Sequence, residues 1–421
     1  MARKMKDSGI EWIGEIPEGW EVGQIGQLYS ERRTKVSDKD YPPLSVTMKG
    51  ILPQLSTAAK TDAHDDRKLV CKGDFAINSR SDRRGSCGIS EQDGSISLIN
   101  TVLQPRREMN PGYYNWLFHT SLFADEFYKW GHGIVDDLWT TGWSDMKKIG
   151  VPVPSKCEQK QLAEYLNFEC FYIDSILSKT RSSIEEYKKL KQAVITQAVT
   201  KGVRGEREMK DSGVEWIGRI PSEWYVAPFT KCLESIIDYR GKTPEKVSDG
   251  TFLVTAKNIK DGKLNYSASK EYVRTEQYED IMHRGKPEIG DVLFTTEAPL
   301  GEVCNVDRTD FALAQRIIKF RGIVGLVNNY YMKYWIMSSF FQNNLRTFAT
   351  GSTAQGIKAS KLGQLKLILP TLEEQQEIAD YLDAKCDEID KLIAKKEQLV
   401  KELESYKRSL IYEVVTGKRE V

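Results

Sequence analysis

Two long stretches of the chain carry apolar side chains at every third or fourth position, the spacing of one face of an α-helix. Neither contains glycine or proline before Gly202 and Gly417, which lie where a helix would end. Residues 173–199 would form a helix roughly 40 Å long at about 1.5 Å per residue. The apolar positions are Ile173, Ile176, Leu177, Ile184, Tyr187, Leu190, Val194 and Val199, and then Ile389, Leu392, Ile393, Leu399, Val400, Leu403, Leu410 and Val414. The pattern predicts two long amphipathic helices.

The start of the second helix is marked by Pro370 and, after it, by Glu374, which places an acidic side chain in the first turn. An amphipathic helix commonly packs on its own domain, and that arrangement stays open here. However, two long helices of similar sequence in one chain also favour pairing with each other. We therefore expect an antiparallel coiled coil.

Residues 23–150 and 227–366 have a different pattern, in which short β-rich runs alternate with glycine and proline. The runs are PPLSVT from Pro42, GDFAIN from Gly73, GDVLFTT from Gly290 and RIIKF from Arg316. Each region closes with an aromatic stretch that we expect to be helical, from Tyr113 and from Tyr330. The expected fold class is α+β, with two globular domains joined by the two long helices.

The chain is a tandem duplication. KDSGIEWIGEIPEGWEV, residues 6–22, returns as KDSGVEWIGRIPSEWYV, residues 210–226, and VPVPSKCEQKQLAEYL, residues 151–166, returns as LILPTLEEQQEIADYL, residues 367–382. We call these repeated segments and the long helices the frame; the regions between them differ. We call residues 6–22 and 210–226 the two boxes. The expected boundaries are 1–154 for the first box and domain, 155–203 for the first helical spacer, 204–370 for the second box and domain, and 371–421 for the second spacer.

Composition narrows the class of protein. At 421 residues with 40% apolar and 29% charged residues, the chain has room for two or three globular domains. No apolar run approaches the roughly 18 residues of a membrane span. Seven scattered cysteines without a C-x-x-C pair indicate reduced thiols and a cytoplasmic location. A net charge of +1 argues mildly against a nucleic-acid binder, unless charge is segregated among the domains.

Motifs for catalysis are weak. NPGYYNW, from Asn110, is similar to the Asn-Pro-Pro-Tyr loop of amino-methyltransferases, but Gly112 replaces the second proline and no glycine-rich cofactor loop accompanies it. We interpret it as a turn before a helix. RGKTP, from Arg240, lacks the first glycine of a phosphate-binding loop. The four histidines have no metal-ligand spacing, so neither a catalytic nor a metal site is expected.

The frame resembles the DNA-specificity (S) subunit of type I restriction-modification enzymes. The resemblance rests on the W-I-G-x-I-P box, the G-D-x-x turn, residues 350–375 (TGSTAQGIKASKLGQLKLILPTLEEQ) and the long helices, and it covers essentially the whole chain. It implies a non-catalytic subunit whose two target-recognition domains each read half of a split double-stranded DNA site. The helices would then form an antiparallel coil that spaces the domains.

The resemblance also implies partners. Two methyltransferase subunits would dock on the frame, bring S-adenosylmethionine and carry out DNA methylation on a flipped adenine in each half-site. Motor-nuclease subunits, which use ATP and Mg, are a further expected partner. No cofactor is expected on this chain itself.

Candidate DNA contacts lie in the variable regions. Arginine can donate to guanine edges or only neutralise phosphate, and a solvated loop is the alternative. The serine, threonine and glutamine candidates could equally cap the next helix. The residues are Arg80, Arg83, Arg84 and Lys49 in the first region, and Arg240, Lys242, Lys257, Ser352, Thr353 and Gln355 in the second.

Two other functions remain alternatives. A non-enzymatic scaffold could use the variable domains to bind proteins, and an autonomous DNA-modifying enzyme would need motifs that we do not find. Salt-dependent DNA binding would separate a DNA reader from a scaffold, because phosphate contacts release counterions.

Overall fold

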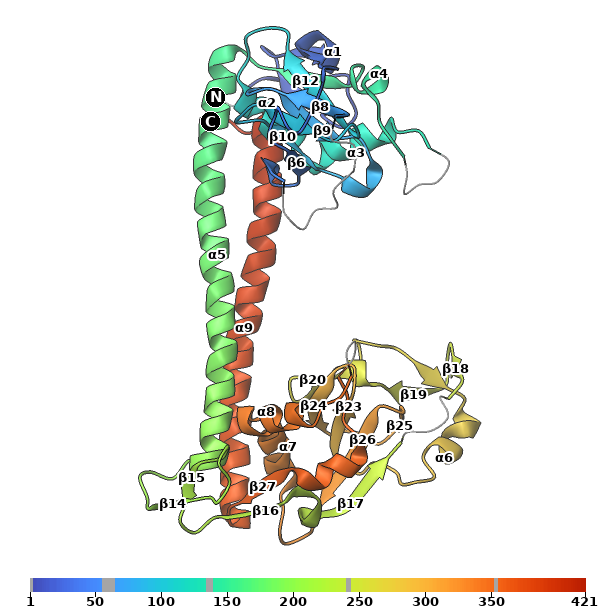
Figure 1. Ribbon diagram of the computed structural model, residues 1–421, viewed down its shortest axis with the longest axis vertical. Helices are drawn as coiled ribbons and strands as arrows, with labels where there is room; N and C mark the ends of the chain where they lie inside the picture. The colour runs from blue at the N-terminus through green and yellow to red at the C-terminus, as the bar shows by residue number, and fades with distance from the viewer. Residues whose placement is uncertain (1–2, 55–64, 134–138, 240–243, 352–354) are drawn as a thin grey trace. The chain divides into compact units, whose positions relative to one another are not determined.

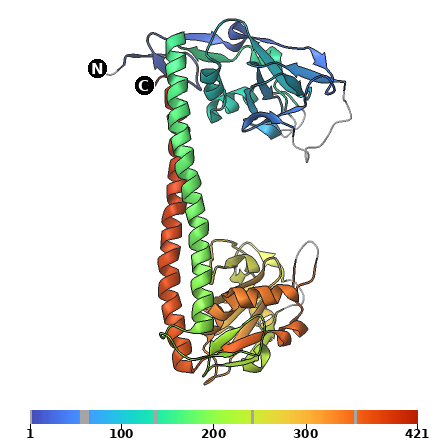
Figure 2. The same ribbon diagram turned by 60° about the vertical axis from the view of Figure 1, so that its left-hand side comes forward.

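The structure, a computed structural model, describes residues 3–54, 65–133, 139–239, 244–351 and 355–421. It divides into two compact units. Unit 1 consists of Met1–Arg181 and Gln398–Val421, and unit 2 of Ser182–Glu397. In each unit, mixed strands and short helices lie beside portions of two long helices (Figures 1 and 2). This agrees with the predicted α+β class.

The two long helices are α5, Lys156–Lys201, and α9, Leu372–Val415. They confirm the predicted helices, and both end at the predicted glycines. Gly202 has a φ of 78° and Gly417 a φ of 71°, the left-handed conformation that glycine adopts without strain. Because the boundary between the units falls at Arg181, α5 begins in unit 1 and ends in unit 2, while α9 does the reverse.

The two helices pair within each unit. In unit 1, Lys407 lies 2.6 Å from Asp174, and Arg181 lies 2.5 Å from Glu404. In unit 2, Lys191 lies 2.6 Å from Asp390, and the Lys396 ammonium lies 5.7 Å from the Tyr187 ring centroid. Residue numbers rise along one helix as they fall along the other, so the pairing is antiparallel, as predicted.

The same helices also contribute to the core of each unit. Leu166 and Ile173 of α5 and Leu410 and Val414 of α9 are buried in the core of unit 1. In unit 2 the corresponding contributions come from Ile195 and Val199 of α5 and from Ile378 and Leu382 of α9. Pairing and packing on a domain, treated as alternatives above, therefore occur together.

Unit 1 is built from small antiparallel sheets. A hairpin of β1 (Met5–Asp7) and β2 (Glu15–Pro17) carries the first box. Strand β3 (Glu21–Gln24) pairs with β13 (Gly150–Val153) and joins the two ends of the variable region. The main sheet has the order β10 (Cys87–Ile89), β9 (Phe75–Asn78), β12 (Asn100–Pro105), β4 (Tyr29–Glu31).

The remaining elements of unit 1 surround this sheet. They are a three-stranded sheet of β11 (Gly94–Ile96), β8 (Arg67–Val70) and β5 (Lys35–Val36), a hairpin of β6 (Leu44–Thr47) and β7 (Gly50–Pro53), helices α1 (Ile25–Leu28), α2 (Pro111–Phe118), α3 (Ser121–Lys129) and α4 (Trp143–Met146), and the 3-10 turn η1 (Ser81–Arg83).

Unit 2 repeats this plan. The box hairpin is β14 (Met209–Asp211) with β15 (Arg219–Pro221), and β16 (Tyr225–Pro228) pairs with β27 (Lys366–Leu369). The main sheet has the order β17 (Leu233–Asp238), β26 (Ile317–Gly322), β23 (Val292–Thr296), β24 (Leu300–Asn305). This is the order of unit 1, with β23 in the place of β9 and β26 in that of β12.

The other elements of unit 2 are more extensive than in unit 1. They are a second sheet of β18 (Lys246–Val247), β22 (Tyr272–Val273), β19 (Thr251–Val254) and β25 (Phe311–Leu313), a hairpin of β20 (Ile259–Lys260) and β21 (Lys263–Leu264), helices α6 (Tyr278–Ile281), α7 (Asn329–Met337) and α8 (Ser339–Thr347), and 3-10 turns η3 (Phe229–Cys232), η4 (Ala256–Asn258), η5 (Thr275–Gln277) and η6 (Ala359–Gln364).

The aromatic stretches are helical, as predicted, but each forms two helices rather than one. His119 is the C-cap of α2, and the next residue, Thr120, caps α3 by accepting from the Phe123 N–H at 3.2 Å. Ser338 does the same between α7 and α8, accepting from the Phe341 N–H at 3.3 Å. These hydroxyls favour a new helix start because they satisfy N–H groups that have no partner in the preceding turn.

Candidate functional site: the frame and the recognition edge

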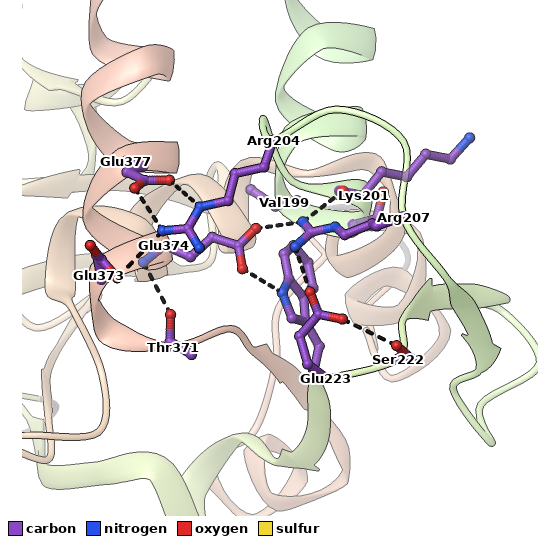
Figure 3. A network of polar contacts seen from close by, with 12 residues as sticks. Val199, Lys201, Arg204, Arg207, Ser222, Glu223, Thr371, Glu373, Glu374 and Glu377 are labelled. Carbon is purple, nitrogen blue, oxygen red and sulfur yellow. Dashed lines mark hydrogen bonds and ion pairs between the residues drawn. The ribbon is translucent and has the colours of Figure 1, made fainter.

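In unit 2 a buried carboxylate joins the repeated box to the start of α9 (Figure 3). The indole of Trp224 donates to Glu374 at 2.8 Å, and Arg207 forms an ion pair with the same carboxylate. The Arg207 guanidinium also lies 4.9 Å from the Trp224 ring centroid. The Glu374 side chain is 1% exposed, and the charge of Arg207 and the indole N–H of Trp224 compensate for the cost of burying this carboxylate.

Unit 1 contains the same three residue types in the same roles. Trp20 donates to Glu158 at 3.0 Å, Arg3 pairs with Glu158, and the guanidinium lies 5.4 Å from the Trp20 ring centroid. Burial opposes ionisation of Glu158, but hydrogen bonds from Trp20, Ser155 and Arg3 outweigh it and hold the pKa of this carboxyl below its usual value. The frame is therefore duplicated in its contacts as well as in its sequence.

The next residue of each long helix repeats a second contact. The Gln159 side chain accepts from the Asn110 N–H at 2.9 Å, and the Gln375 side chain accepts from the Asn328 N–H at 2.8 Å. Asn110 caps α2 through the Tyr113 N–H at 3.2 Å. NPGYYNW is thus a helix cap, as we interpreted it, and no methyltransferase loop.

Helix ends complete the frame in each unit. The Tyr113 hydroxyl donates to the Val415 carbonyl at 2.7 Å, and Tyr331 makes a longer contact of 3.4 Å with the Val199 carbonyl. A Cβ added at Gly202 would collide with the Arg207 guanidinium, so space as well as backbone conformation favours glycine there. Each unit thus binds the start of one long helix and the end of the other.

The predicted arginines of unit 1 lie on one exposed loop after β9. Arg80 precedes η1 and its backbone bridges Thr140. Arg84 pairs with Asp125 at 2.6 Å and lies 5.4 Å from the Tyr128 ring centroid. Arg83 has its nearest carboxylate at 3.7 Å and a side chain that is 69% exposed. Arg83 is therefore less constrained by intramolecular contacts than Arg84.

Lys49 lies in the β6–β7 turn and is exposed. The next residue, Gly50, lies against Gly88, where a Cβ would meet the Gly50 Cα at 2.8 Å. The turn is therefore held beside β10, which directly follows the arginine loop. We call the surface formed by Arg80–Arg84, Lys49 and the Thr140 bridge the recognition edge of unit 1.

Four of the predicted residues in unit 2 lie outside the described residues: Arg240, Lys242, Ser352 and Thr353. Lys257 is exposed within η4, after the strand that matches the one before Lys49. Gln355 is exposed and precedes Gly356, whose backbone bridges Glu297. We call the surface formed by Lys257, Glu297–Pro299, Arg316 and the Gly356 bridge the recognition edge of unit 2.

The two edges occupy equivalent positions on the main sheets. The Ser79 N–H donates to the Ile99 carbonyl at 3.3 Å, and the Thr296 N–H donates to the Arg316 carbonyl at 3.0 Å. Arg80 therefore corresponds to Glu297, and Ile99 to Arg316. Arg316, which lies 2.8 Å from Glu297, was not predicted as a contact residue. The sequence carries no local signal for Arg316, because it is a lone arginine whose carboxylate partner lies in a different turn.

The part of the chain that the structure describes holds neither a metal-binding cluster nor a membrane-spanning helix. Within residues 3–54, 65–133, 139–239, 244–351 and 355–421, no group of three histidine, cysteine, aspartate or glutamate side chains is placed to hold a metal ion. In the same ranges, no helix has the length and apolar character to cross a membrane.

Comparisons with known proteins agree with this geometry. The family model for the type I restriction modification DNA specificity domain matches residues 231–403. The MjaVIII specificity subunit of a type I restriction enzyme from Methanocaldococcus jannaschii is 24% identical over 431 aligned residues, which cover 96% of this chain and 93% of that protein. A putative MjaX specificity subunit of the same organism is 22% identical, covering 96% and 95% of the two chains.

Solved structures share the fold. A chain from a study of complex assembly and conformational transition in the type I R-M system superposes with a TM-score of 0.73 at 13% identity, covering 96% of this chain and 99% of that one. The HsdS subunit of Thermoanaerobacter tengcongensis gives 0.52 at 15% identity, with 96% and 98% covered. The chain therefore carries the type I restriction modification DNA specificity domain at residues 231–403, and it is similar over nearly its whole length to specificity subunits of type I restriction enzymes. It is a non-catalytic DNA-recognition subunit, and catalysis resides in other subunits of these systems.

Proposed function

We propose that unit 1 and unit 2 each read one half of a single bipartite DNA site, through their recognition edges. The observation that carries the proposal is the contrast between frame and edge. The triad of Trp20, Glu158 and Arg3 makes the same contacts as the triad of Trp224, Glu374 and Arg207. In contrast, the loops that follow the equivalent strands β9 and β23 differ in length, charge and sequence. A duplicated frame with different edges suits one machinery that reads two different sequences.

The frame supports a second part of the proposal. Any partner that recognises the box and the adjoining helix start would find that site twice, so we assign two methyltransferase subunits to it. These subunits would carry S-adenosylmethionine, and motor-nuclease subunits using ATP and Mg would join the same assembly in the cytoplasm. The candidate contact residues of both edges, including the four outside the described residues, remain proposals for direct DNA contact.

Exchange of one variable region tests the proposal. The natural cut points lie in the β3–β13 ladder, where Gly23 pairs with Val151 and Gln24 with Gly150. Replacing residues 23–150 by the region of another such subunit keeps the first half of that ladder and all of the frame. The chimera and the wild-type chain would each be expressed with the methyltransferase subunits, and methylated adenines would be mapped across the genome.

The expected result is a methylated motif in which one half is new and the other half is unchanged. The matched control is a chimera that exchanges residues 227–366 instead and should change the opposite half. A change in both halves from a single exchange would contradict independent reading. Absence of salt-dependent DNA binding in the wild-type complex would instead favour the protein-binding scaffold.

A further inference from the structure

A cavity of about 290 Å³ opens at the recognition edge of unit 2. Its apolar part is formed by Pro244, Leu253, Ala256, Ala298 and Ala314. Three of these five residues are alanines, so small side chains make up much of the apolar wall. The cavity lies beside the Glu297–Pro299 turn, which takes the place of the arginine loop in unit 1.

Three of the six polar side chains around the cavity are cationic. Lys257 and Arg316 line it together with Lys246, whose ammonium lies 2.6 Å from Glu271. Burial disfavours the charged form of Glu271, but the hydrogen bond from Lys246 and the nearby charge of Lys257 keep its pKa below the usual value. A flat group with hydrogen-bond acceptors along one edge would match this combination of a small apolar lining and N–H donors.

Arg316 is held in place by one contact. Its Nε lies 2.8 Å from Glu297 Oε1, and the two side chains are 49% and 44% exposed. The contact uses one of the five N–H donors of a guanidinium. Glu297 therefore orients the planar group, which is the requirement for two parallel hydrogen bonds to a base edge.

Comparison with unit 1 strengthens this assignment. At the equivalent pair of positions unit 1 has Arg80 and Ile99, and unit 2 has Glu297 and Arg316. Each edge thus has one arginine at this pair. In unit 1 the arginine follows β9, whereas in unit 2 it precedes β26, the strand that corresponds to β12. Both edges thus keep an arginine, although its position differs between them. This is what we would expect if both edges contact a ligand rich in hydrogen-bond acceptors but read different bases of it.

We propose that this cavity receives the edge of a guanine in the half-site read by unit 2, with Arg316 donating to guanine O6 and N7. Glu297 is the positioning residue for Arg316, and Lys257 contacts the neighbouring phosphate. The inference rests on the proposed function, because it names the residues by which one of the two edges reads sequence.

The experiment uses the full chain in complex with its methyltransferase subunits. Binding is measured to duplexes that carry the mapped bipartite site and every single-base replacement in each half. Arg316→Ala should reduce discrimination at one position of one half-site by roughly 5- to 150-fold, the range for one bidentate contact. Arg316→Lys should lose the same discrimination, because an ammonium keeps the charge but not the fork geometry.

Two further variants separate the roles. Glu297→Gln should relax the same position by a smaller factor, since the guanidinium remains but is less firmly oriented. Lys257→Ala should weaken binding to all duplexes alike and make the salt dependence shallower. Arg308→Ala is the matched control, because Arg308 is 44% exposed and lies 3.1 Å from Asp310, as Arg316 does beside Glu297, but does not line the cavity.

Three results would overturn the inference. They are an unchanged base preference in Arg316→Ala, a uniform loss over all duplexes, or full rescue of discrimination by Arg316→Lys. Failure of the wild-type complex to select any bipartite sequence would be a failure of the proposed function itself. If the wild type selects a bipartite sequence and one of the three results is also found, only the proposed guanine contact at the cavity would be rejected.

Discussion

The two copies of the frame make the same contacts in different surroundings. The Glu374 side chain in unit 2 is 1% exposed and that of Glu158 in unit 1 is 29% exposed, although each accepts from a buried tryptophan and pairs with an arginine. In unit 2 the arginine is also held by Glu223 at 2.8 Å. Contacts of the same geometry therefore need not contribute equally to the stability of the two units, because burial sets the free-energy cost of losing a partner.

The recognition edges differ in the opposite way. Their strand pairings coincide, with Leu103 opposite Phe75 and Phe320 opposite Val292, while the side chains that reach solvent do not. The two edges therefore differ in their exposed side chains, while the pairing of the strands beneath them is the same. This separation lets the edges diverge without disturbing the frame, and each prediction below tests one side of it.

The largest expected effect concerns the buried carboxylate. Glu374→Gln preserves the shape of the side chain but removes the buried carboxylate and leaves Arg207 with the half-exposed Glu223, so we expect unit 2 to lose about 3 kcal/mol of stability. Glu158→Gln should cost unit 1 about 1 kcal/mol, because that pair is partly solvated. Amide hydrogen exchange, followed for peptides of each unit across a urea series, measures both. Equal losses in the two units would show that burial does not distinguish the copies.

The next effect concerns the arginine loop of unit 1. Arg83→Ala should reduce DNA binding by about 1–3 kcal/mol and relax one base position if this side chain contacts a base. Arg84→Ala is the matched comparison, and a smaller effect is expected because Arg84 is already engaged by Asp125 and Tyr128. Competition binding with duplexes that carry single-base replacements measures the affinity and the base preference of both variants. A loss shared by all sequences would assign Arg83 to phosphate, and no loss would assign it to a solvated loop.

The helices and the β-rich regions could be predicted because the spacing of apolar residues and the positions of glycine and proline are local properties of the sequence. The ends at Gly202 and Gly417 followed from residue type alone, and so did the strand at Phe75. The triad could not be predicted in this way. Trp224 and Glu374 are 150 positions apart, and no spacing rule relates a box to a helix start until the chain has folded.

The candidate site was predictable only in part, for a similar reason. A cluster such as Arg80–Arg84 is visible in the sequence because its members are adjacent. Arg316 is a lone arginine before a strand, and its proposed role depends on the neighbouring turn at Glu297 and on the cavity that Arg316 lines. Burial is not visible in the sequence either: Thr141 follows the Arg80–Thr140 bridge but is buried, and its hydroxyl donates to the Phe127 carbonyl at 2.9 Å.

A smaller effect is expected at the helix caps that follow the main sheets. Asn328 accepts from the Tyr330 N–H at 2.8 Å and donates to Gln376 at 2.7 Å, whereas Asn110 accepts from the Tyr113 N–H at 3.2 Å. Replacing either by alanine should cost about 1 kcal/mol, and slightly more at Asn328. Urea midpoints of the two variants measure the difference. A larger loss at Asn110 would show that the second contact of Asn328 contributes nothing.

The smallest effect is a pH dependence in unit 1. The pKa of Glu158 is lowered in the folded chain, so its ion pair contributes stability above the pKa of the unfolded chain, and that contribution is lost as the pH falls through the folded value. The stability difference between wild type and Glu158→Gln should therefore be largest near neutral pH and shrink progressively below about pH 4.5. Urea denaturation of both proteins at several pH values, followed by hydrogen exchange in unit 1, provides the measurement. The other carboxyl groups are the same in both proteins, so their contributions cancel in the comparison. Because the amide of the Glu158→Gln variant cannot titrate, the remaining pH dependence comes from Glu158. A difference that stayed constant down to pH 3 would mean that Glu158 holds Trp20 and Arg3 by geometry alone, without a net contribution from its charge.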